Sequence, residues 1–227
     1  MMTDDELLHY ARQILLSDVD VDGQERLRSA HVVVLGLGGL GSPLALYLGA
    51  AGIGRLTLVD GDTVDETNLH RQVIHSQASL HQFKVDSAKD RILGINPWIH
   101  VDVIRAHADD QNVSSLIASS DCIADCTDRL ATRFLANRLA VSLKRPVVSA
   151  AALGVEGQLT TIDPRQQSNP CYACLVPDVP EVEPTCSETG VLGPVVGTLG
   201  SLQAVEVLGV LLGWPDRLVG RLLRFHA

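Results

Sequence analysis

A glycine-rich turn that follows a buried strand constrains the fold of this chain more than any other feature. Residues 31–36 (HVVVLG) are apolar and mostly β-branched, which is typical of a short strand buried on both faces. The pattern Gly36-x-Gly38-Gly39-x-Gly41 comes next, followed by a helical stretch over 44–51 and a second apolar strand over 56–60. Strand, tight turn, helix and strand in this order predict a βαβ unit with two parallel strands.

Strands and helices continue to alternate after this unit. Asn96-Pro97 ends one helical stretch, and the apolar runs beyond it are short enough to be strands. The expected helices cover 84–93, 113–118 and 130–144, and the expected strands cover 99–104, 122–125, 146–150 and 158–162. This alternation predicts an α/β fold: a Rossmann-like, doubly wound and mostly parallel sheet.

The N-terminal residues do not follow this alternation. Thr3 and Glu6 form a capping-box pattern, and apolar residues from Leu7 to Leu15 recur at helical spacing, so an amphipathic helix is expected there. Asp22-Gly23 predicts a turn, and residues 24–28 a short second helix.

A second exception is the segment 163–197, which holds six of the ten prolines and three of the five cysteines. It is expected to form an irregular, Cys- and Pro-rich crossover, followed by a helix over 198–212 and a closing strand over 221–225. We therefore expect a single domain over 1–227, with an N-terminal helical arm over 1–30.

Composition excludes several classes of partner. The formal net charge is -9 and no Lys/Arg-rich run occurs, so neither nucleic acid nor an anionic membrane is expected as a partner. The 5 cysteines are an odd number and no signal peptide precedes them, which indicates reduced thiols and a cytoplasmic location. The most apolar stretch, 191–214, contains Gln203 and Glu206 and predicts a buried helix, not a membrane span.

The glycine turn indicates an adenine nucleotide. Glycines let the backbone approach a phosphate group, and the N-terminus of the next helix supplies N–H donors and the positive end of a dipole, so Gly36, Gly38, Gly39 and Gly41 are candidate phosphate-binding residues. Asp60 ends the second strand, where a carboxylate accepts hydrogen bonds from ribose hydroxyls. NAD and FAD enzymes use the same turn, so the kind of nucleotide stays open.

Cationic residues after the βαβ unit favour a nucleotide that loses pyrophosphate. Asn68-x-x-Arg71-Gln72 follows the unit, and Lys84 lies thirteen residues beyond Arg71. A guanidinium grips two phosphate oxygens and an ammonium adds a mobile charge, which a triphosphate needs more than a dinucleotide does. Taken alone, such residues are more often ordinary surface cations.

Asp128 ends the stretch Asp125-Cys-Thr-Asp128 after a predicted strand. Ligands of open α/β sheets bind beyond the carboxyl ends of strands, so Asp128 is a candidate Mg²⁺ ligand facing the same crevice. The alternative is that Asp128 caps the helix over 130–144, and both roles are compatible.

The cysteines of the irregular segment suggest half of a zinc site. Cys171 and Cys174 form a CxxC pair, whereas a structural zinc needs four ligands. Cys122 and Cys126 fall on a buried strand, His226 is a speculative further ligand, and no second CxxC occurs, so the expectation is a reduced pair more than a zinc site.

These motifs together resemble the ThiF/MoeB/HesA adenylyltransferases, bacterial relatives of ubiquitin-activating enzymes. The matching stretches occur in family order from residue 10 to the end of the chain. They are Tyr10-Ala-Arg12-Gln13, 36–41, Asp60 with Asp62, Asn68-Leu-His-Arg71-Gln72, Lys84, 125–128, Cys171-Tyr-Ala-Cys174, Thr185-Cys186, Gly193-Pro194 and 200–204.

The resemblance implies an activity and a role for each matching residue. ATP would activate the C-terminal Gly-Gly carboxylate of a ubiquitin-like sulfur carrier as an acyl-adenylate, releasing pyrophosphate. Arg12 would reach across a homodimer to the phosphates, and Cys186 matches a thiol of sulfur transfer. Contacts with ATP or Mg²⁺ are implied for Gly39, Asp60, Asn68, Arg71, Lys84 and Asp128, with Arg71, Lys84, Asp128 and Arg12 as the catalytic group.

Three departures from the family pattern keep alternatives open. The chain stops at Ala227, where relatives continue to a second CxxC; Arg129 stands where the family usually has Asn; and His70 replaces a Gln. The alternatives are an NAD-type oxidoreductase and a shortened, non-catalytic relative that docks a carrier. Molybdopterin, thiamin and other sulfur pathways use near-identical chemistry, so the sequence does not name the carrier.

Overall fold

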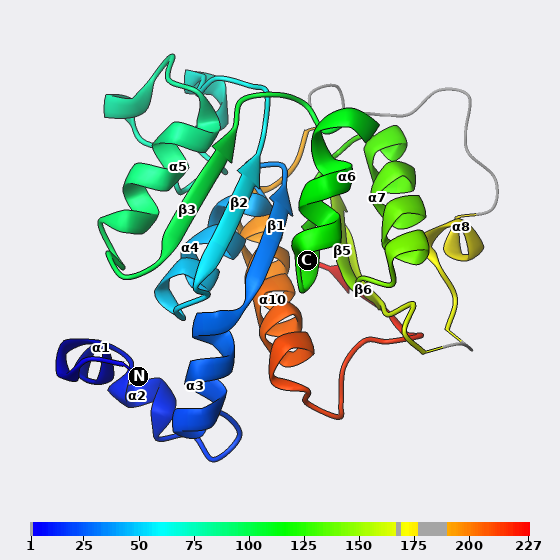
Figure 1. Ribbon diagram of the computed structural model, residues 1–227. Coiled ribbons are helices and arrows are strands. Elements are labelled where there is room, and N and C mark those ends of the chain that lie inside the picture. Colours follow the sequence, from blue (N-terminus) through cyan, green and yellow to red (C-terminus); the bar gives the residue numbers. More distant parts are fainter. Residues whose placement is uncertain (1, 167–168, 177–189) are drawn as a thin grey trace.

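A doubly wound sheet forms the centre of the protein. The computed structural model describes residues 2–166, 169–176 and 190–227, and within them seven strands pair in the order β3-β2-β1-β4-β5-β6-β7 (Figure 1). Strands β3 to β5 in this order are parallel, and β6 and β7 extend the sheet antiparallel. The strands are β1 (His31–Leu35), β2 (Arg55–Val59), β3 (His100–Ile104), β4 (Cys122–Asp125), β5 (Val147–Leu153), β6 (Glu156–Ile162) and β7 (Leu222–His226). The predicted α/β class with a mostly parallel sheet is confirmed.

Two apolar cores lie on opposite faces of the sheet because successive side chains of a strand point to opposite sides. Val32 and Val34 of β1 pack into one core, and Val33 and Leu35 into the other. The first core is completed by helices α4 (Gly41–Ala50), α5 (Lys84–Leu93) and α10 (Gly193–Leu212), and the second by α6 (Asp110–Ser119), α7 (Leu130–Leu143) and the short α8 (Tyr172–Leu175). Helices on both faces explain why the strands read as continuous apolar runs.

Helix α10 is an internal element of this packing. Among the described residues it is the one helix long and apolar enough to cross a membrane, and 56% of its apolar window is buried inside the protein. Gln203, fully buried, donates hydrogen bonds to the carbonyls of Asp125 (2.8 Å) and Val148 (2.9 Å) and accepts one from the Cys126 thiol (3.3 Å). The polar side chain that interrupts the apolar run therefore joins α10 to β4 and β5, which places a core helix where the sequence predicted one.

The prediction of one continuous N-terminal helix is wrong at Tyr10. The chain forms α1 (Asp4–His9) and α2 (Ala11–Ile14), with Tyr10 between them at φ -91° and ψ 5°. The Tyr10 ring is buried and its hydroxyl accepts a hydrogen bond from Asn96 at 2.7 Å, so a tertiary contact fixes the break. Figure 1 shows both short helices at one end of the molecule, joined to the sheet through α3.

The predicted turn at Asp22-Gly23 is also wrong, since both residues lie inside α3 (Asp20–Ser29). A Cβ on Gly23 would lie 3.1 Å from the side chain of Leu212, so this glycine permits close packing of α3 against α10 rather than a turn. The sequence correctly marks this position as one that needs glycine, but the reason is close helix packing and not a turn.

The irregular segment contains more regular structure than predicted. Helix α8 lies within it, and α10 begins at Gly193 with Pro194 in its first turn, five residues before the predicted start at Thr198. Proline fits the first turn of a helix because its missing N–H would have no partner there, so Pro194 marked a helix start, not a loop.

Candidate functional site

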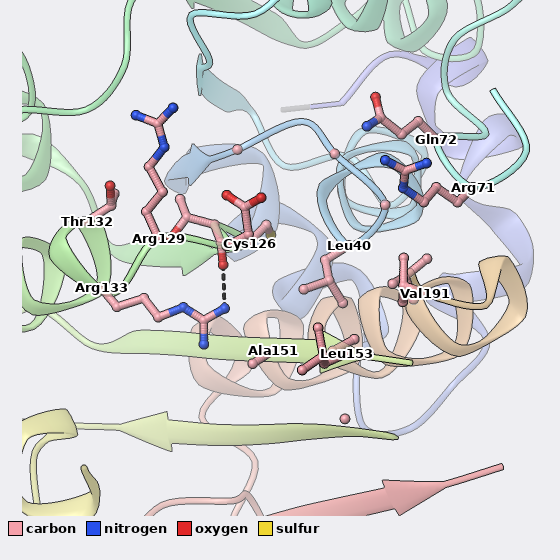
Figure 2. A pocket seen from close by; sticks show the side chains of 18 of the residues that line it. Leu40, Arg71, Gln72, Cys126, Arg129, Thr132, Arg133, Ala151, Leu153 and Val191 are labelled. Atoms are coloured by element: carbon pink, nitrogen blue, oxygen red, sulfur yellow. Dashed lines mark hydrogen bonds between the residues drawn. The ribbon is translucent and has the colours of Figure 1, made fainter. Parts of the chain in front are cut away.

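One large cavity opens at the carboxyl ends of β1, β2 and β4, where a doubly wound sheet binds its ligands. Its volume is about 860 Å³, within the range of small-molecule sites. Figure 2 shows Arg71 and Gln72 on one side of this pocket and Arg129 and Arg133 on the other. Eight of the predicted site residues line it together: Gly36, Gly38, Gly39, Asp60, Asn68, Arg71, Lys84 and Asp128.

The glycine turn needs its glycines for two separate reasons. Gly36 has φ +90°, and a Cβ there would also lie 3.1 Å from the carbonyl oxygen of Cys126. Gly41 does not line the cavity, but a Cβ on it would lie 2.0 Å from the carbonyl oxygen of Gly36. Gly41 therefore allows the backbone of the turn to pack tightly against Gly36. Gly38 and Gly39 face the cavity at the start of α4.

The carboxylate of Asp60 holds two loops as well as facing the cavity. It accepts hydrogen bonds from the backbone N–H of Leu37 in the glycine turn (2.7 Å) and from that of Asp62 (2.8 Å). Burial raises the pKa of Asp60 above its usual value, although the charge of Lys84 and both N–H groups oppose this. Each carboxylate oxygen keeps a free lone pair, so the predicted ribose contact is compatible with this geometry.

Lys84 is buried at the first position of α5, with its side chain only 7% exposed. Its Nζ donates to the Asp62 carboxylate at 2.9 Å, and the His107 Nε2 lies 3.7 Å from the same carboxylate. Burial alone would raise the pKa of Asp62, but the hydrogen bond and charge of Lys84 outweigh it and lower that pKa. Asp62 was part of the matched sequence pattern without an assigned role, and the structure makes it the partner that holds Lys84 at the cavity.

Arg71 faces the cavity, and its hydrogen-bond partners lie in its own loop. Its guanidinium donates to the carbonyl of Thr67 (2.9 Å) and to Asn68 Oδ1 (3.2 Å), and it contacts the His70 ring at 2.8 Å. None of these groups is a carboxylate, so the positive charge is oriented without being neutralised. Asn68 Oδ1 also accepts from Gln72 (2.8 Å), which makes Asn68 the residue that organises this loop.

Hydrogen bonds to Asp125 and Arg133 fix the turn that carries Asp128. The Asp125 carboxylate accepts hydrogen bonds from the Thr127 backbone N–H (3.1 Å) and hydroxyl (2.7 Å), and from the Ser149 hydroxyl (2.7 Å). Arg133 of α7 donates to the Thr127 carbonyl, as Figure 2 shows. Asp128 is exposed within the cavity, and the N-cap residue of α7 is Arg129 rather than Asp128.

The thiols of Cys171 and Cys174 lie 3.6 Å apart, with Cys174 exposed at the end of the second core. No group of three or more His, Cys, Asp or Glu side chains suited to a metal ion occurs in the described part of the chain. His226 lines the cavity and lies 3.6 Å from Glu156, so it belongs to a different region than the thiol pair. Within the described residues the thiol pair supplies two of the four ligands that a structural zinc site needs.

One predicted residue lies away from the cavity, and another cannot be placed. Arg12 is exposed on α2 and does not line the pocket of its own chain. Cys186 lies outside the described residues.

The cavity also contains charged side chains that the sequence reading did not single out as ligands. Arg133 and Arg224 add cations, and His107 lines the wall near Asp62. Arg224 reaches the cavity because β7 pairs with β6, a long-range contact that no local pattern contains. Arg129 was noted only as a departure from a family pattern, and it also lines the cavity.

A glycine turn, a carboxylate at the end of the next strand and two fixed cations in one cavity define a nucleotide-binding, doubly wound α/β protein. The comparison with known families is more specific. The chain belongs to the ThiF family, which it matches over residues 10–227.

Two relatives illustrate the sequence similarity. The chain is 43% identical over 226 residues to the molybdopterin-synthase adenylyltransferase of Escherichia coli (strain K12), covering 100% of this chain and 90% of that protein. It is 42% identical over 226 residues to the adenylyltransferase and sulfurtransferase MOCS3 of Culex quinquefasciatus, covering 99% of this chain and 51% of that protein. The chain thus spans about half the length of this second relative.

Solved structures share the fold. A crystal structure of PaaA superimposes with a TM-score of 0.82 at 25% identity, covering 99% of this chain and 71% of that one. A crystal structure of E. coli MccB with ATP gives a TM-score of 0.81 at 22% identity, covering 96% and 68%. At this level of identity the MccB likeness supports the fold alone.

Proposed function

We propose that this chain is an ATP-dependent adenylyltransferase that activates the C-terminal Gly-Gly carboxylate of a ubiquitin-like sulfur carrier. The observation that carries the proposal is that Arg71 and Lys84 line the same cavity as Gly38, Gly39 and Asp60. The relatives named as adenylyltransferases, one of them matched over 90% of its length, support the same activity.

The proposed reaction is a displacement at the α-phosphate of ATP. A carboxylate oxygen of the carrier attacks the α-phosphorus, the bond to the bridging oxygen breaks, and pyrophosphate leaves with the electron pair. The nucleophile is already an anion, so no general base is needed. Negative charge grows on the departing group, which is where fixed cations lower the barrier.

The two cations suit different parts of that task. Arg71 uses three of its five N–H donors for contacts within its own loop, so its charge and its two remaining donors are available to phosphate oxygens. Lys84 gives one of its three donors to Asp62, which leaves two for a ligand. Asp60 would hold the ribose, and the amides at the start of α4 would meet the phosphates.

Magnesium fits this donor set. Mg²⁺ bound with a nucleotide takes one or two carboxylates, phosphate oxygens and several waters. Asp128 supplies an exposed carboxylate in the cavity, so it would hold the ion, and Mg²⁺ would supply positive charge next to the phosphates. A protein cage of three or more ligands is not required.

The carrier and a second copy of the chain complete the proposal. The cavity continues over β5 and β6, where Ala151, Ala152 and Gly157 are small enough to pass a Gly-Gly tail. Arg12, exposed on α2, would act on the cavity of a partner in a homodimer. A reducing, cytoplasmic location is part of the proposal, because cysteines stay as thiols there.

An NAD-type oxidoreductase explains fewer of these observations. It would use the glycine turn and Asp60 but leave Arg71 and Lys84 in the cavity without a role. A shortened, non-catalytic relative would keep the cavity without needing its charges.

The test is ATP–pyrophosphate exchange measured with a panel of ubiquitin-like carriers that end in Gly-Gly. Exchange is expected with the cognate carrier, and none with the same carrier after removal of its last two glycines. Carrier binding without exchange in both the wild type and Arg71→Ala would instead favour the non-catalytic reading, and tight NAD binding without ATP binding would favour the oxidoreductase.

A further inference from the structure

A buried histidine outside the proposed mechanism contacts the glycine turn. His75 lies four residues beyond Arg71, and its side chain reaches the turn and α5 at once. The His75 Nε2 lies 3.2 Å from the Leu37 carbonyl oxygen, and its Nδ1 lies 2.9 Å from the Ser87 hydroxyl. Ser87 follows Lys84 by three residues on α5, so the histidine joins the helix that carries the lysine to the turn that faces the nucleotide.

The partners of His75 define which nitrogen carries its proton. A carbonyl oxygen only accepts hydrogen bonds, so Nε2 donates to Leu37, and in the neutral ring Nδ1 accepts from the Ser87 hydroxyl. Burial, opposed by the bond to Leu37 and assisted by the charge of Lys84, lowers the pKa of His75 to about 4. The ring is therefore neutral at physiological pH and acts as an oriented donor.

The peptide group after Leu37 is held at a defined angle as a result. The Leu37 N–H is bound by Asp60 at 2.7 Å, and its carbonyl is bound by His75. The C=O of Leu37 and the N–H of Gly38 belong to one planar, trans peptide and point in opposite directions. A group that fixes the carbonyl therefore also fixes the direction of the Gly38 N–H.

The Gly38 N–H is the donor that this arrangement leaves available. Gly38 lines the cavity, and within the described part of the chain no acceptor takes its N–H. Backbone N–H groups at a glycine turn before a helix are the usual donors to phosphate oxygens. We propose that His75 is a positioning residue that aims the Gly38 N–H at a phosphate group of the nucleotide, an inference that rests on the proposed binding of ATP in this cavity.

Two substitutions separate the two nitrogens of the ring. The amide nitrogen of Gln lies as many bonds from Cα as Nε2 does, so His75→Gln keeps a donor for the Leu37 carbonyl. The amide of Asn matches Nδ1, so His75→Asn keeps a partner for Ser87 and loses the bond to Leu37. The pair is matched in polarity and differs in the contact that the proposal concerns.

The experiment measures the dissociation constants of ATP and of adenosine by calorimetry for the full chain and both variants, with urea unfolding alongside. His75→Asn is expected to weaken ATP about fivefold, the scale of one hydrogen bond, and to leave adenosine unchanged. His75→Gln is expected to stay within about twofold of the wild type for both ligands. Equal weakening of ATP by both variants, or equal weakening of ATP and adenosine by His75→Asn, would overturn the assignment.

A second variant keeps the test decisive if His75→Asn does not fold. His75→Leu places an apolar side chain of similar size at the buried position and leaves the Leu37 carbonyl without its donor, so it is expected to weaken ATP about fivefold without affecting adenosine. No difference between His75→Leu and the wild type for ATP would overturn the positioning role. A wild type that binds no ATP would overturn the proposed function itself, whereas a wild type that binds ATP alongside unaffected variants would overturn only the role of His75.

Discussion

Replacement of Lys84 tests how much of the proposed catalysis comes from one buried cation. Lys84→Met keeps the length of the side chain and removes the charge. A unit charge about 4 Å from a phosphate oxygen contributes roughly 4 kcal/mol at an effective dielectric constant near 20. The Asp62 Oδ2 lies 2.9 Å from the Lys84 Nζ. Placed about 7 Å from the same oxygen, its opposite charge offsets roughly 2.4 kcal/mol of that.

Lys84→Met leaves the Asp62 charge in place, so the whole contribution of roughly 4 kcal/mol is lost, which corresponds to about 10³-fold in exchange rate, and at least about tenfold is expected. The net figure of roughly 2 kcal/mol, or about 20- to 30-fold, applies when the Asp62 charge is removed as well. Steady-state ATP–pyrophosphate exchange at saturating carrier is the assay. Lys89→Met is the matched control, because Lys89 lies on the same helix and does not line the cavity, and it should exchange at the wild-type rate.

A double variant distinguishes two roles for Lys84. If its only task were to neutralise Asp62, adding Asp62→Asn to Lys84→Met would restore exchange. We expect the double variant to remain at least about tenfold below the wild type, because the phosphates still lack the ammonium. Full recovery in the double variant, or undiminished exchange by Lys84→Met, would refute the reasoning.

Further predictions concern other parts of the site and the core. Arg71→Ala should lower exchange at least about tenfold, and Arg71→Lys should not restore it because two fixed donors are lost; both are measured by exchange against ATP concentration. Asp128→Ala should lower exchange at least about tenfold and raise the Mg²⁺ concentration needed for half-maximal rate. Gln203→Ala should lower the free energy of unfolding by about 3 kcal/mol in urea, because two buried carbonyls lose their donor. Because the pKa of His75 falls from 6.5 to about 4 on folding, the contribution of the neutral ring to the free energy of unfolding is fully present above pH 6.5. It should fall by about 1.4 kcal/mol per pH unit between pH 6.5 and about 4, and His75→Gln should lack this component in urea titrations at pH 7 and pH 5.

The parts of the fold that sequence predicted are those with local causes. In the run from His31 to Leu35, every residue after the histidine is apolar, so both faces of the strand are apolar. Its burial between two helical layers therefore follows from composition alone. The helix over 84–93 and the strand over 122–125 have the predicted bounds, because their apolar periodicity ends where their structure ends. The pocket residues gathered as expected since they follow the carboxyl ends of neighbouring parallel strands.

The parts that sequence did not predict depend on contacts between distant segments. Tyr10 breaks the first helix because Asn96 binds its hydroxyl, and Gly23 lies inside a helix because Leu212 packs against it. His75 contacts the glycine turn through a bond that joins residues 38 positions apart. No period or motif encodes such pairs, so their roles become visible only when the chain is folded.

The most direct test of the central claim is the intact mass of a Gly-Gly carrier after incubation with the wild-type chain, ATP and Mg²⁺. Addition of one AMP to the carrier, lost when Lys84→Met or Arg71→Ala replaces the wild type, is the predicted result. A carrier that keeps its mass while the same sample binds ATP tightly would contradict adenylation by this cavity.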